Sequence, residues 1–435
     1  MCISDTLTRT LVKYPPIPCG NNVVVSSTTS SKGNSIYVAL RYETKIEIWK
    51  LGQSLNVNLN GEKDAPNSVW KNKYLPLKED AKKILTLNSK DNTPIMNFDM
   101  AYNGSVLAYL TTDSSIRIFE MDLETNNEDN NRLPKITRIP FKSQKDLVAD
   151  GHIINEKLGY NIVKCLSSPE LGSKTKILLS TYGGTLQCYE LTIGHDTDPS
   201  VITLLWSLSP RECLDIHSGI SYLEAHPNGL CCAIASYDGT VRLINMLNAK
   251  TKKNITNNTV TKPTVHKVPF YNLAIVSSMA FSPKSDGNLI IVYANHHFVE
   301  VESASGHYTD FTNKMMNLGK KYRQLPKEWS DKQFSTKAIS FIEDTAPHSK
   351  ENELIVFYDE ANICTFDKRT WFSNILETNS TNISIKSETN GPSTKSAKKN
   401  KGKNKLNSYH FLSVSTFCWD TLCTVTYSTK LFCFR

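Results

Sequence analysis

The sequence repeats one unit seven times: a strand of alternating apolar and polar residues, a turn that holds Gly, Asn or Asp, and a second strand of similar length. The clearest copy runs from Ile220 to Leu247, where Asp238 and Gly239 give a tight hairpin signal. Each copy ends in an apolar or aromatic residue at an equivalent place. These residues are Trp49, Phe119, Tyr189, Ile244, Val301, Phe366 and Phe432.

The repeat spacing constrains the fold further. Successive end residues lie 55 to 70 positions apart, whereas a minimal WD repeat takes about 40–45 residues. The excess lies in polar insertions at 126–131, 250–262 and 375–407, which are typical of solvated loops. A four-stranded sheet must stack on its neighbours to bury both faces, and closing the stack into a ring removes its exposed edges. We therefore expect an all-β, WD-repeat-like β-propeller of about seven blades with long polar loop insertions, built as a single propeller over 1–435.

Two β-sandwiches are the alternative fold, but sandwiches do not require a near-regular unit copied seven times. The Trp-Asp dipeptide at Trp419 and Asp420 lies between strands of the last unit, so it is not the WD signature. Hydrophobic residues make up 39% of the chain, which is enough to build a core. No apolar stretch approaches the roughly 20 residues that cross a bilayer, so we expect no membrane contact. The N-terminal residues lack the apolar segment of a secretory signal.

The eleven cysteines are scattered along the chain, without a CxxC pair or zinc-ligand spacing. Their odd number and their spread indicate a reducing compartment. Cys188, Cys231, Cys364 and Cys433 stand in apolar strands, where a free thiol acts as a small hydrophobe. We expect no metal site.

No nucleophile elbow, P-loop, dinucleotide fingerprint, metalloprotease helix or kinase motif is present in the sequence. Asp113, Asp238 and Asp359 fall in hairpin turns, where Asp is favoured because its side chain bonds the local backbone. His296 and His297 fall where a turn between strands is expected, so we interpret them as turn residues. The sequence thus predicts a non-enzymatic protein without catalytic residues or a cofactor.

Charge is concentrated in one segment. The chain carries a net charge of +8, and six of its lysines, with no acidic residue, lie within 395–405. We expect 376–407 to form a disordered, lysine-rich loop that binds RNA phosphates or serves as a nuclear-localisation signal; a solubilising loop is the alternative. The lysines are Lys395, Lys398, Lys399, Lys401, Lys403 and Lys405, and a weaker basic cluster holds Lys320, Lys321 and Arg323 beside Tyr322.

Several segments resemble, in order, the C-terminal propeller of the cirhin family. They are Val38–Gly52, Tyr74–Leu85, Ile95–Met121, Val268–Thr312 and Glu353–Lys368. Cirhin is a tandem-propeller subunit of the small-subunit processome, in its transcription-associated UTP subcomplex (t-UTP, or UtpA). Family members carry another propeller ahead of this one, so the resemblance implies that the chain corresponds to the second propeller. The likeness ends after Lys405.

The resemblance implies a scaffold of the nucleus and nucleolus that acts in pre-rRNA processing and small-subunit biogenesis and supports rDNA transcription. Its implied partners are other t-UTP subunits, the 5′ external transcribed spacer of pre-rRNA and the small nucleolar ribonucleoprotein.

Two other classes of function remain open from the residues alone. One is a propeller adaptor for a ubiquitin ligase or a chromatin complex, which fold alone permits. Arginines at the ends of late blade strands would favour it, but Arg117 and Arg242 lie before their strand ends. The other is a propeller hydrolase, which requires His and carboxylates converging on the channel; we find no such set in the sequence.

Overall fold

The computed structural model describes the chain in nineteen stretches. These are residues 2–5, 10–13, 23–30, 33–51, 81–123, 134–141, 159–167, 174–194, 200–226, 229–246, 263–270, 274–283, 287–317, 336–343, 353–358, 362–368, 415–416, 422–425 and 431–434.

In this part of the chain the strands form seven antiparallel sheets, here termed blades 1 to 7, and one separate hairpin. The hairpin pairs β1 (Cys2–Asp5) with β2 (Thr10–Lys13). Blade 1 holds β3 (Val23–Ser30), β4 (Gly33–Arg41), β5 (Lys45–Lys50) and β6 (Lys82–Asn88). Blade 2 holds β7 (Ile95–Met100), β8 (Val106–Thr111), β9 (Ile116–Asp122) and β10 (Lys135–Ile139). Blade 3 holds β11 (Tyr160–Leu166), β12 (Lys174–Thr181), β13 (Leu186–Thr192) and β14 (Val201–Leu208).

The later blades follow the same order along the chain. Blade 4 holds β15 (Ile220–Ala225), β16 (Cys231–Ser236), β17 (Val241–Asn245) and β18 (Thr264–Lys267). Blade 5 holds β19 (Val276–Phe281), β20 (Leu289–Tyr293) and β21 (Phe298–Val301). Blade 6 holds β22 (Ala338–Glu343), β23 (Glu353–Tyr358), β24 (Asn362–Asp367) and β25 (Ser415–Thr416), and blade 7 holds β26 (Leu422–Val425) and β27 (Leu431–Phe434). Short helical segments are η1 (Lys90–Asn92), η3 (Pro210–Leu214) and α1 (Asp310–Asn317).

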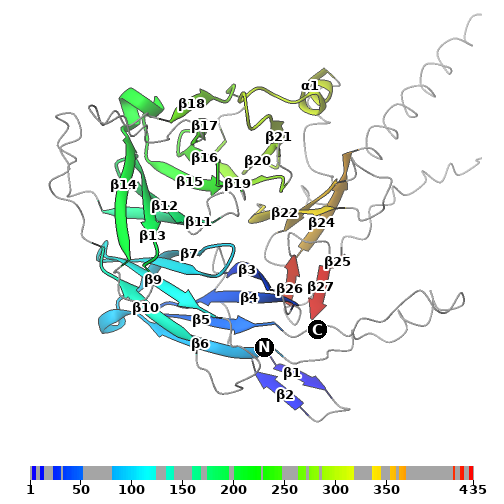
Figure 1. Cartoon of the computed structure of the whole chain (residues 1–435). Helices are drawn as coiled ribbons and strands as arrows, with labels where there is room; N and C mark the ends of the chain where they lie inside the picture. Colours follow the sequence, from blue (N-terminus) through cyan, green and yellow to red (C-terminus); the bar gives the residue numbers. More distant parts are fainter. Residues whose placement is uncertain are drawn as a thin grey trace, which may run out of the picture.

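The blades follow one another around a common axis (Figure 1). Strand order within each sheet follows chain order, and the first strands of successive blades pack on one another from β3 through β7, β11, β15 and β19 to β22. Blade 7 returns toward blade 1 (Figure 1). This arrangement, with the first strands innermost and the fourth strands at the rim, is a β-propeller, as the sequence repeat predicts.

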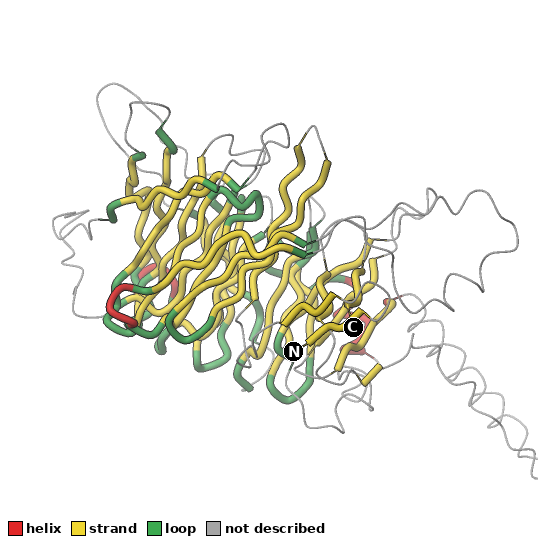
Figure 2. The backbone as a smooth tube through the Cα atoms, turned by 90° about the horizontal axis from the view of Figure 1, so that it is seen from below, coloured by secondary structure: helices red, strands yellow, loops and turns green. Residues whose placement is uncertain are grey.

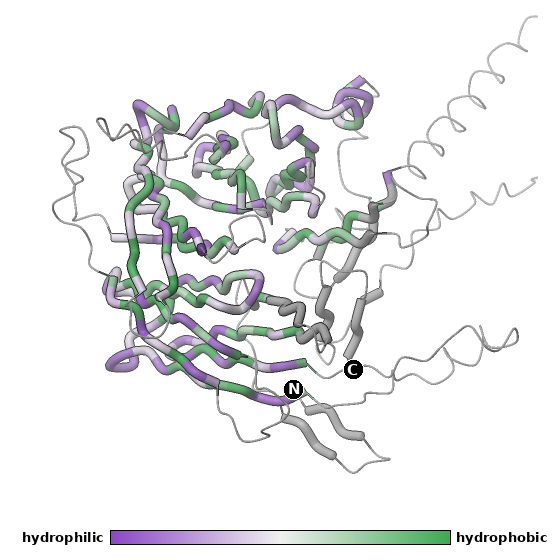
Figure 3. The backbone as a smooth tube through the Cα atoms, viewed as in Figure 1, coloured by the Kyte–Doolittle hydropathy of each residue, from purple (hydrophilic) through white to green (hydrophobic). Residues whose placement is uncertain are grey.

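The hydrophobic core consists of layers between neighbouring blades. Separate buried clusters join blades 1 and 2, 2 and 3, 3 and 4, 4 and 5, and 5 and 6. Middle strands are covered on both faces, so β8 and β20 are buried along their whole length and read as continuous apolar runs. Rim strands such as β6 are largely exposed. Figure 3 shows hydrophobic residues concentrated along the strands inside the molecule.

The seven predicted units correspond to strands of the seven blades, with one difference. Phe411–Phe434 spans β25, which is the fourth strand of blade 6, as well as both strands of blade 7. In the described part of blade 5 the helix α1 packs beside β21 where a fourth strand would lie, a substitution that the sequence did not predict. Cys188 is buried in a core cluster and Cys231 packs at the edge of another, as expected for apolar thiols. The side chains of Cys364 and Cys433 lie outside the described set.

Candidate functional site

One face of the propeller combines the start of each first strand with the turn between the second and third strands. In four consecutive blades an N–H group of that turn donates to the carbonyl of the residue that precedes the first strand, at 2.9 to 3.1 Å. These bonds run from Thr112 to Pro94, Tyr182 to Gly159, Tyr237 to Gly219 and Ala294 to Ile275. We name this the turn face. Figure 2 shows the strands running between the two faces, with turns gathered at their ends.

Two of the predicted turn aspartates hold the turns of this face. The Asp113 carboxylate accepts the Ser115 N–H at 3.1 Å and the Thr111 hydroxyl at 2.5 Å. Asp238 accepts the N–H and the hydroxyl of Thr240 at 2.9 and 2.8 Å. Hydrogen bonding, first from Thr111, lowers the pKa of Asp113. Burial acts to raise the pKa of Asp238, but hydrogen bonds from Ser236 and Thr240 outweigh it and lower that pKa. The structural interpretation is confirmed for both; Asp359 lies outside the described residues.

The predicted histidine turn is also confirmed. His296 has φ 64°, in the left-handed region, where the corresponding turns of blades 3 and 4 place Gly184 and Gly239. Histidine is among the side chains that tolerate this region. Burial lowers the pKa of His296, and its Nδ1 has no hydrogen-bond partner in the described part of the chain. The His297 N–H donates to Asn295 at 3.4 Å, which closes the turn.

Exposed apolar side chains gather on the turn face. The described residues include six large apolar side chains that are exposed, and five of them lie at first-strand starts, in the turns, or in the connection that leads to the next first strand. The five are Met96 (40% exposed), Tyr182 (47%), Tyr237 (58%), Phe270 (56%) and Ile275 (49%). The sixth, Val201, starts β14 at the opposite face. Such clustering is a mark of interaction surfaces.

Three of these residues, Met96, Tyr182 and Tyr237, lie on the turn face of the successive blades 2, 3 and 4, and we name them the apolar row. The Tyr182 hydroxyl lies 3.4 Å from the Met96 sulfur of the preceding blade. Gly219 connects Tyr182 with Tyr237: a Cβ atom at this position would lie 2.9 Å from the Tyr182 carbonyl and 3.5 Å from the Tyr237 ring. The absence of a side chain at Gly219 therefore leaves room beside this residue for both the Tyr182 carbonyl and the Tyr237 ring.

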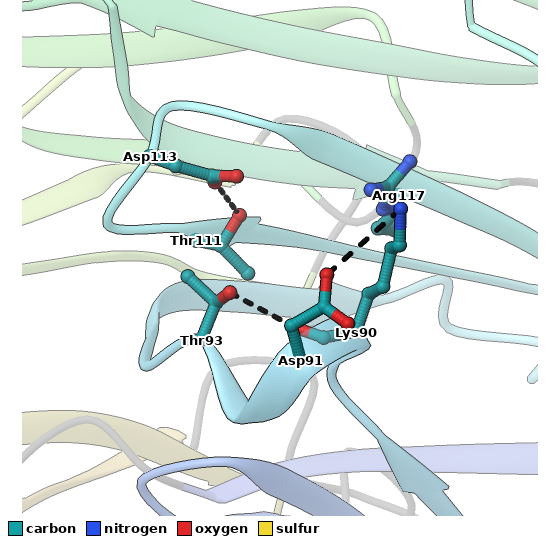
Figure 4. A pocket seen from close by; sticks show the side chains of 6 residues that line it. All are labelled: Lys90, Asp91, Thr93, Thr111, Asp113 and Arg117. Carbon is teal, nitrogen blue, oxygen red and sulfur yellow. Dashed lines mark hydrogen bonds and ion pairs between the residues drawn. The ribbon is translucent and has the colours of Figure 1, made fainter.

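A small polar pocket lies on blade 2 (Figure 4). Its lining comes from η1 and from the turn between β8 and β9: Lys90, Asp91, Thr93, Thr111, Asp113 and Arg117. The Lys90 Nζ and Asp91 Oδ2 atoms are 3.9 Å apart and both side chains are highly exposed, so their attraction is weak. Thr93 donates to the Lys90 carbonyl at 2.9 Å. The pocket mixes both signs of charge and holds no buried acid–base pair.

The innermost strands are joined by polar side chains. Asn97 and Asp99 of β7 accept the N–H groups of Val163 and Cys165 of β11 at 3.0 and 2.7 Å. In the same way Asn161 of β11 donates to the Ile220 carbonyl at 3.0 Å. These bonds satisfy backbone groups on the free edge of each first strand. They explain polar residues that sequence analysis did not single out.

Three charged residues, Asp99, Lys164 and Glu224, connect the first strands of blades 2, 3 and 4, and we name them the charged joint. Lys164 of β11 pairs with Glu224 of β15 at 3.2 Å. Burial acts to lower the pKa of Lys164, but Glu224 and Asp99 raise it. Desolvation raises the pKa of Asp99 to about 6, although Lys164 counteracts it. Each of these groups is engaged in holding the blades together, so we assign the cluster a structural role.

Of the two arginines that bear on an adaptor function, Arg242 is held by neighbouring residues. Arg242 is 8% exposed at its side chain and donates to the Leu214 and Asp215 carbonyls at 2.8 and 2.7 Å. Asp215 also pairs with Lys267 at 2.6 Å. Arg117 lines the polar pocket. Arg242 is therefore unavailable to a partner.

The basic residues predicted to contact RNA or to direct nuclear import lie outside the described residues. This holds for Lys395, Lys398, Lys399, Lys401, Lys403 and Lys405, and for Lys320, Lys321 and Arg323. Within the described stretches no group of three or more His, Cys, Asp or Glu side chains is placed to hold a metal ion. None of the described helices has the length and apolar character needed to cross a membrane.

No protein-family model and no curated protein matches the chain. Among solved structures it is similar to Sqt1 from Chaetomium thermophilum bound to the N-terminus of the ribosomal protein L10, at 10% identity and TM-score 0.44, covering 80% of this chain and 85% of that one. It is also similar to the Cps50 (Swd1) β-propeller domain of Myceliophteria thermophila, at 14% identity and TM-score 0.43, covering 82% and 86%. The order and packing of the sheets show that the chain is a β-propeller.

Proposed function

We propose that this protein is a non-enzymatic scaffold that binds protein partners through its turn face. The observation that carries the proposal is the apolar row of Met96, Tyr182 and Tyr237, which presents uncharged side chains to solvent across three blades. Tyrosine and methionine are enriched at protein interfaces because they supply large contact areas. Phe270 and Ile275 extend the apolar surface into blades 4 and 5.

We further propose that the scaffold works in the small-subunit processome, as a subunit of its t-UTP subcomplex. The support is the ordered resemblance to the second propeller of the cirhin family. On this proposal the chain acts in the nucleus and nucleolus, in pre-rRNA processing, small-subunit biogenesis and rDNA transcription. Its partners are other t-UTP subunits, the 5′ external transcribed spacer and the small nucleolar ribonucleoprotein. The lysines of 395–405 supply the charge for contact with RNA phosphates.

Affinity purification of a tagged chain from cells, followed by quantitative mass spectrometry and pre-rRNA detection, tests both levels of the proposal. Replacing Tyr182 and Tyr237 together by Ser removes two large contact surfaces, and we expect recovery of partner proteins to fall at least about tenfold. Val201→Ser is the matched control, because this residue is equally exposed on the opposite face.

Unchanged recovery in the double variant would rule out docking through the apolar row. Recovery of partners that include neither processome subunits nor pre-rRNA would rule out the processome role while leaving the docking role in place.

A further inference from the structure

Met96 differs from the other methionines of the core region in its exposure. Its side chain is 40% exposed. Among the other methionines whose side chains the structure describes, Met316 is partly buried, and Met100, Met121, Met246, Met279 and Met315 are at most 4% exposed. Oxidants reach an exposed thioether far more readily than a buried one.

Met96 also departs from the pattern of its structural position. The first strands of blades 2 to 5 each contain one extra residue where the pairing register shifts, and these residues are Met96, Asn161, Ser221 and Ser277. The polar three bond the second strand of their own blade: Asn161 with Ser180 at 2.5 Å, and Ser221 and Ser277 with carbonyls at 3.1 Å. Met96 has no hydrogen-bond donor, and its side chain lies 40% exposed at the surface, where its sulfur accepts from Tyr182 of the next blade.

The sulfur of Met96 is approached from one side by the next blade. The Tyr182 hydroxyl lies 3.4 Å from Sδ, in position to donate to one of its two lone pairs. The two lone pairs of a thioether are stereochemically distinct within a chiral protein, because adding oxygen to one or the other gives different sulfoxide epimers. Tyr182 therefore leaves one lone pair open to an oxidant.

We propose that Met96 is a site of reversible oxidation by hydrogen peroxide and that it forms one methionine sulfoxide epimer in excess. The free lone pair of sulfur attacks one peroxide oxygen, the O–O bond breaks, and the second oxygen leaves as water after taking up the proton of the first. Sulfur is oxidised by two electrons and peroxide is reduced by two. A methionine sulfoxide reductase restores the thioether: a pair of thiols supplies two electrons and two protons and becomes a disulfide, and the sulfoxide oxygen leaves as water.

Oxidation changes the character of the apolar row. A sulfoxide is polar, so its formation at Met96 places a strong hydrogen-bond acceptor at one end of a surface that is otherwise uncharged and mostly apolar. We expect it to weaken docking at the turn face. This consequence rests on the docking function proposed above, whereas the oxidation itself does not.

The first experiment treats the purified full chain with hydrogen peroxide and follows each methionine by peptide mapping and mass spectrometry. Met96 is expected to oxidise at least about tenfold faster than Met100, which lies in the same strand and is buried. Equal rates at these two residues in the folded protein would overturn the proposal.

The second experiment reads the epimer. Two classes of methionine sulfoxide reductase each reduce one epimer, so the fraction of Met96 sulfoxide that each class repairs gives the ratio. We expect an excess of one epimer in the native protein and about equal amounts in Tyr182→Phe, which lacks the hydroxyl. Tyr237→Phe is the matched control and should keep the native ratio. A native ratio near one, or a control that shifts as much as Tyr182→Phe, would refute the role of Tyr182.

Recovery of partners after peroxide treatment tests the consequence separately. Recovery is compared before and after peroxide within each protein, so that any change of basal docking in Met96→Leu cancels. Loss on oxidation in the native protein but not in Met96→Leu, which cannot be oxidised at this position, supports redox control of docking. Loss in both proteins, or in neither, overturns that control.

Discussion

Two aspartates of blade 2 show how position decides what a carboxylate does. Asp113 lies exposed in a turn, and hydrogen bonds from Thr111 and Ser115 lower its pKa. Asp99 is 7% exposed on the innermost strand, and desolvation raises its pKa to about 6 despite the neighbouring Lys164. Ionisation of Asp113 therefore stabilises the folded chain, whereas ionisation of Asp99 destabilises it. The sequence shows two aspartates in one unit and does not distinguish them.

The titration of Asp99 leads to a prediction of pH-dependent stability. Because its pKa is higher in the folded chain (about 6) than in the unfolded chain (about 3.9), the folded state binds the proton more tightly. The contribution of this residue to the free energy of unfolding is therefore fully present below pH 4 and falls as the pH rises to about 6, by on the order of 3 kcal/mol. Urea denaturation between pH 4 and 7 measures it.

Asp99→Asn keeps an oxygen that can accept the Cys165 N–H, as Asn97 does for Val163. We expect the variant to lose this fall in stability over the same pH window. Asp113→Asn is a matched control of opposite sign, because a lowered pKa gives stability that is lost as the pH falls. An unchanged pH profile in Asp99→Asn would contradict the assignment.

At the scale of elements, blade 5 shows how a helix can complete a sheet. Thr309 and Thr312, at the start of α1, satisfy the backbone of Glu300 on β21. The Thr309 N–H donates to the Glu300 carbonyl at 3.2 Å, and the Glu300 N–H donates to the Thr312 hydroxyl at 2.8 Å. The Glu300 carboxylate is buried and pairs with Lys368, which follows β24 of blade 6. One side chain thus connects a strand, a helix and the next blade.

We predict that Lys368→Met destabilises the protein by about 3 to 5 kcal/mol, because it leaves the Glu300 carboxylate, 3% exposed, without its cation. Thermal or urea denaturation measures the loss. Lys174→Met is the matched control: its pair with Glu190 is more exposed, at 50% and 21%, so its loss should cost less than about 1 kcal/mol. Equal losses of stability in the two variants would show that burial of the Glu300–Lys368 pair does not increase its contribution to stability.

Prediction from sequence succeeded for some elements and failed for others for one reason. Second strands such as β8 and β16 are covered on both faces, so each carries a strong apolar run and is followed by turn residues. Rim strands such as β10, and the helix α1, follow polar insertions or lie at the surface, where burial leaves a weak pattern. The same weakness hides the apolar row, because nothing local marks Tyr182 and Tyr237 as neighbours.

At the scale of the whole molecule, the excess positive charge and the exposed apolar residues lie in different segments of the chain. The apolar row belongs to blades 2 to 4, whereas six lysines without an acidic neighbour lie within 395–405, between β24 and β25 in the chain. Removing these lysines takes most of the net charge of +8 away. The protein contact and the RNA contact that we propose can therefore be altered one at a time.

We predict that changing Lys398, Lys399, Lys401, Lys403 and Lys405 to Ala weakens nuclear retention or RNA binding and shifts stability by less than about 1 kcal/mol. Fluorescence localisation and RNA affinity at several salt concentrations measure the effect, since lost phosphate contacts reduce the salt dependence. If localisation and salt-dependent affinity both stay unchanged, the segment only solubilises the chain.

The sequence by itself determined the strands that are buried, the turns that join them and the number of repeated units, because period-two alternation and turn residues are local properties of the chain. The ring, the joint of Asp99, Lys164 and Glu224, and the row from Met96 to Tyr237 were decided by the tertiary structure. These features bring together residues from different blades, often more than 50 positions apart. Contacts of this kind exist only once the sheets pack, since each blade buries its faces against its neighbours.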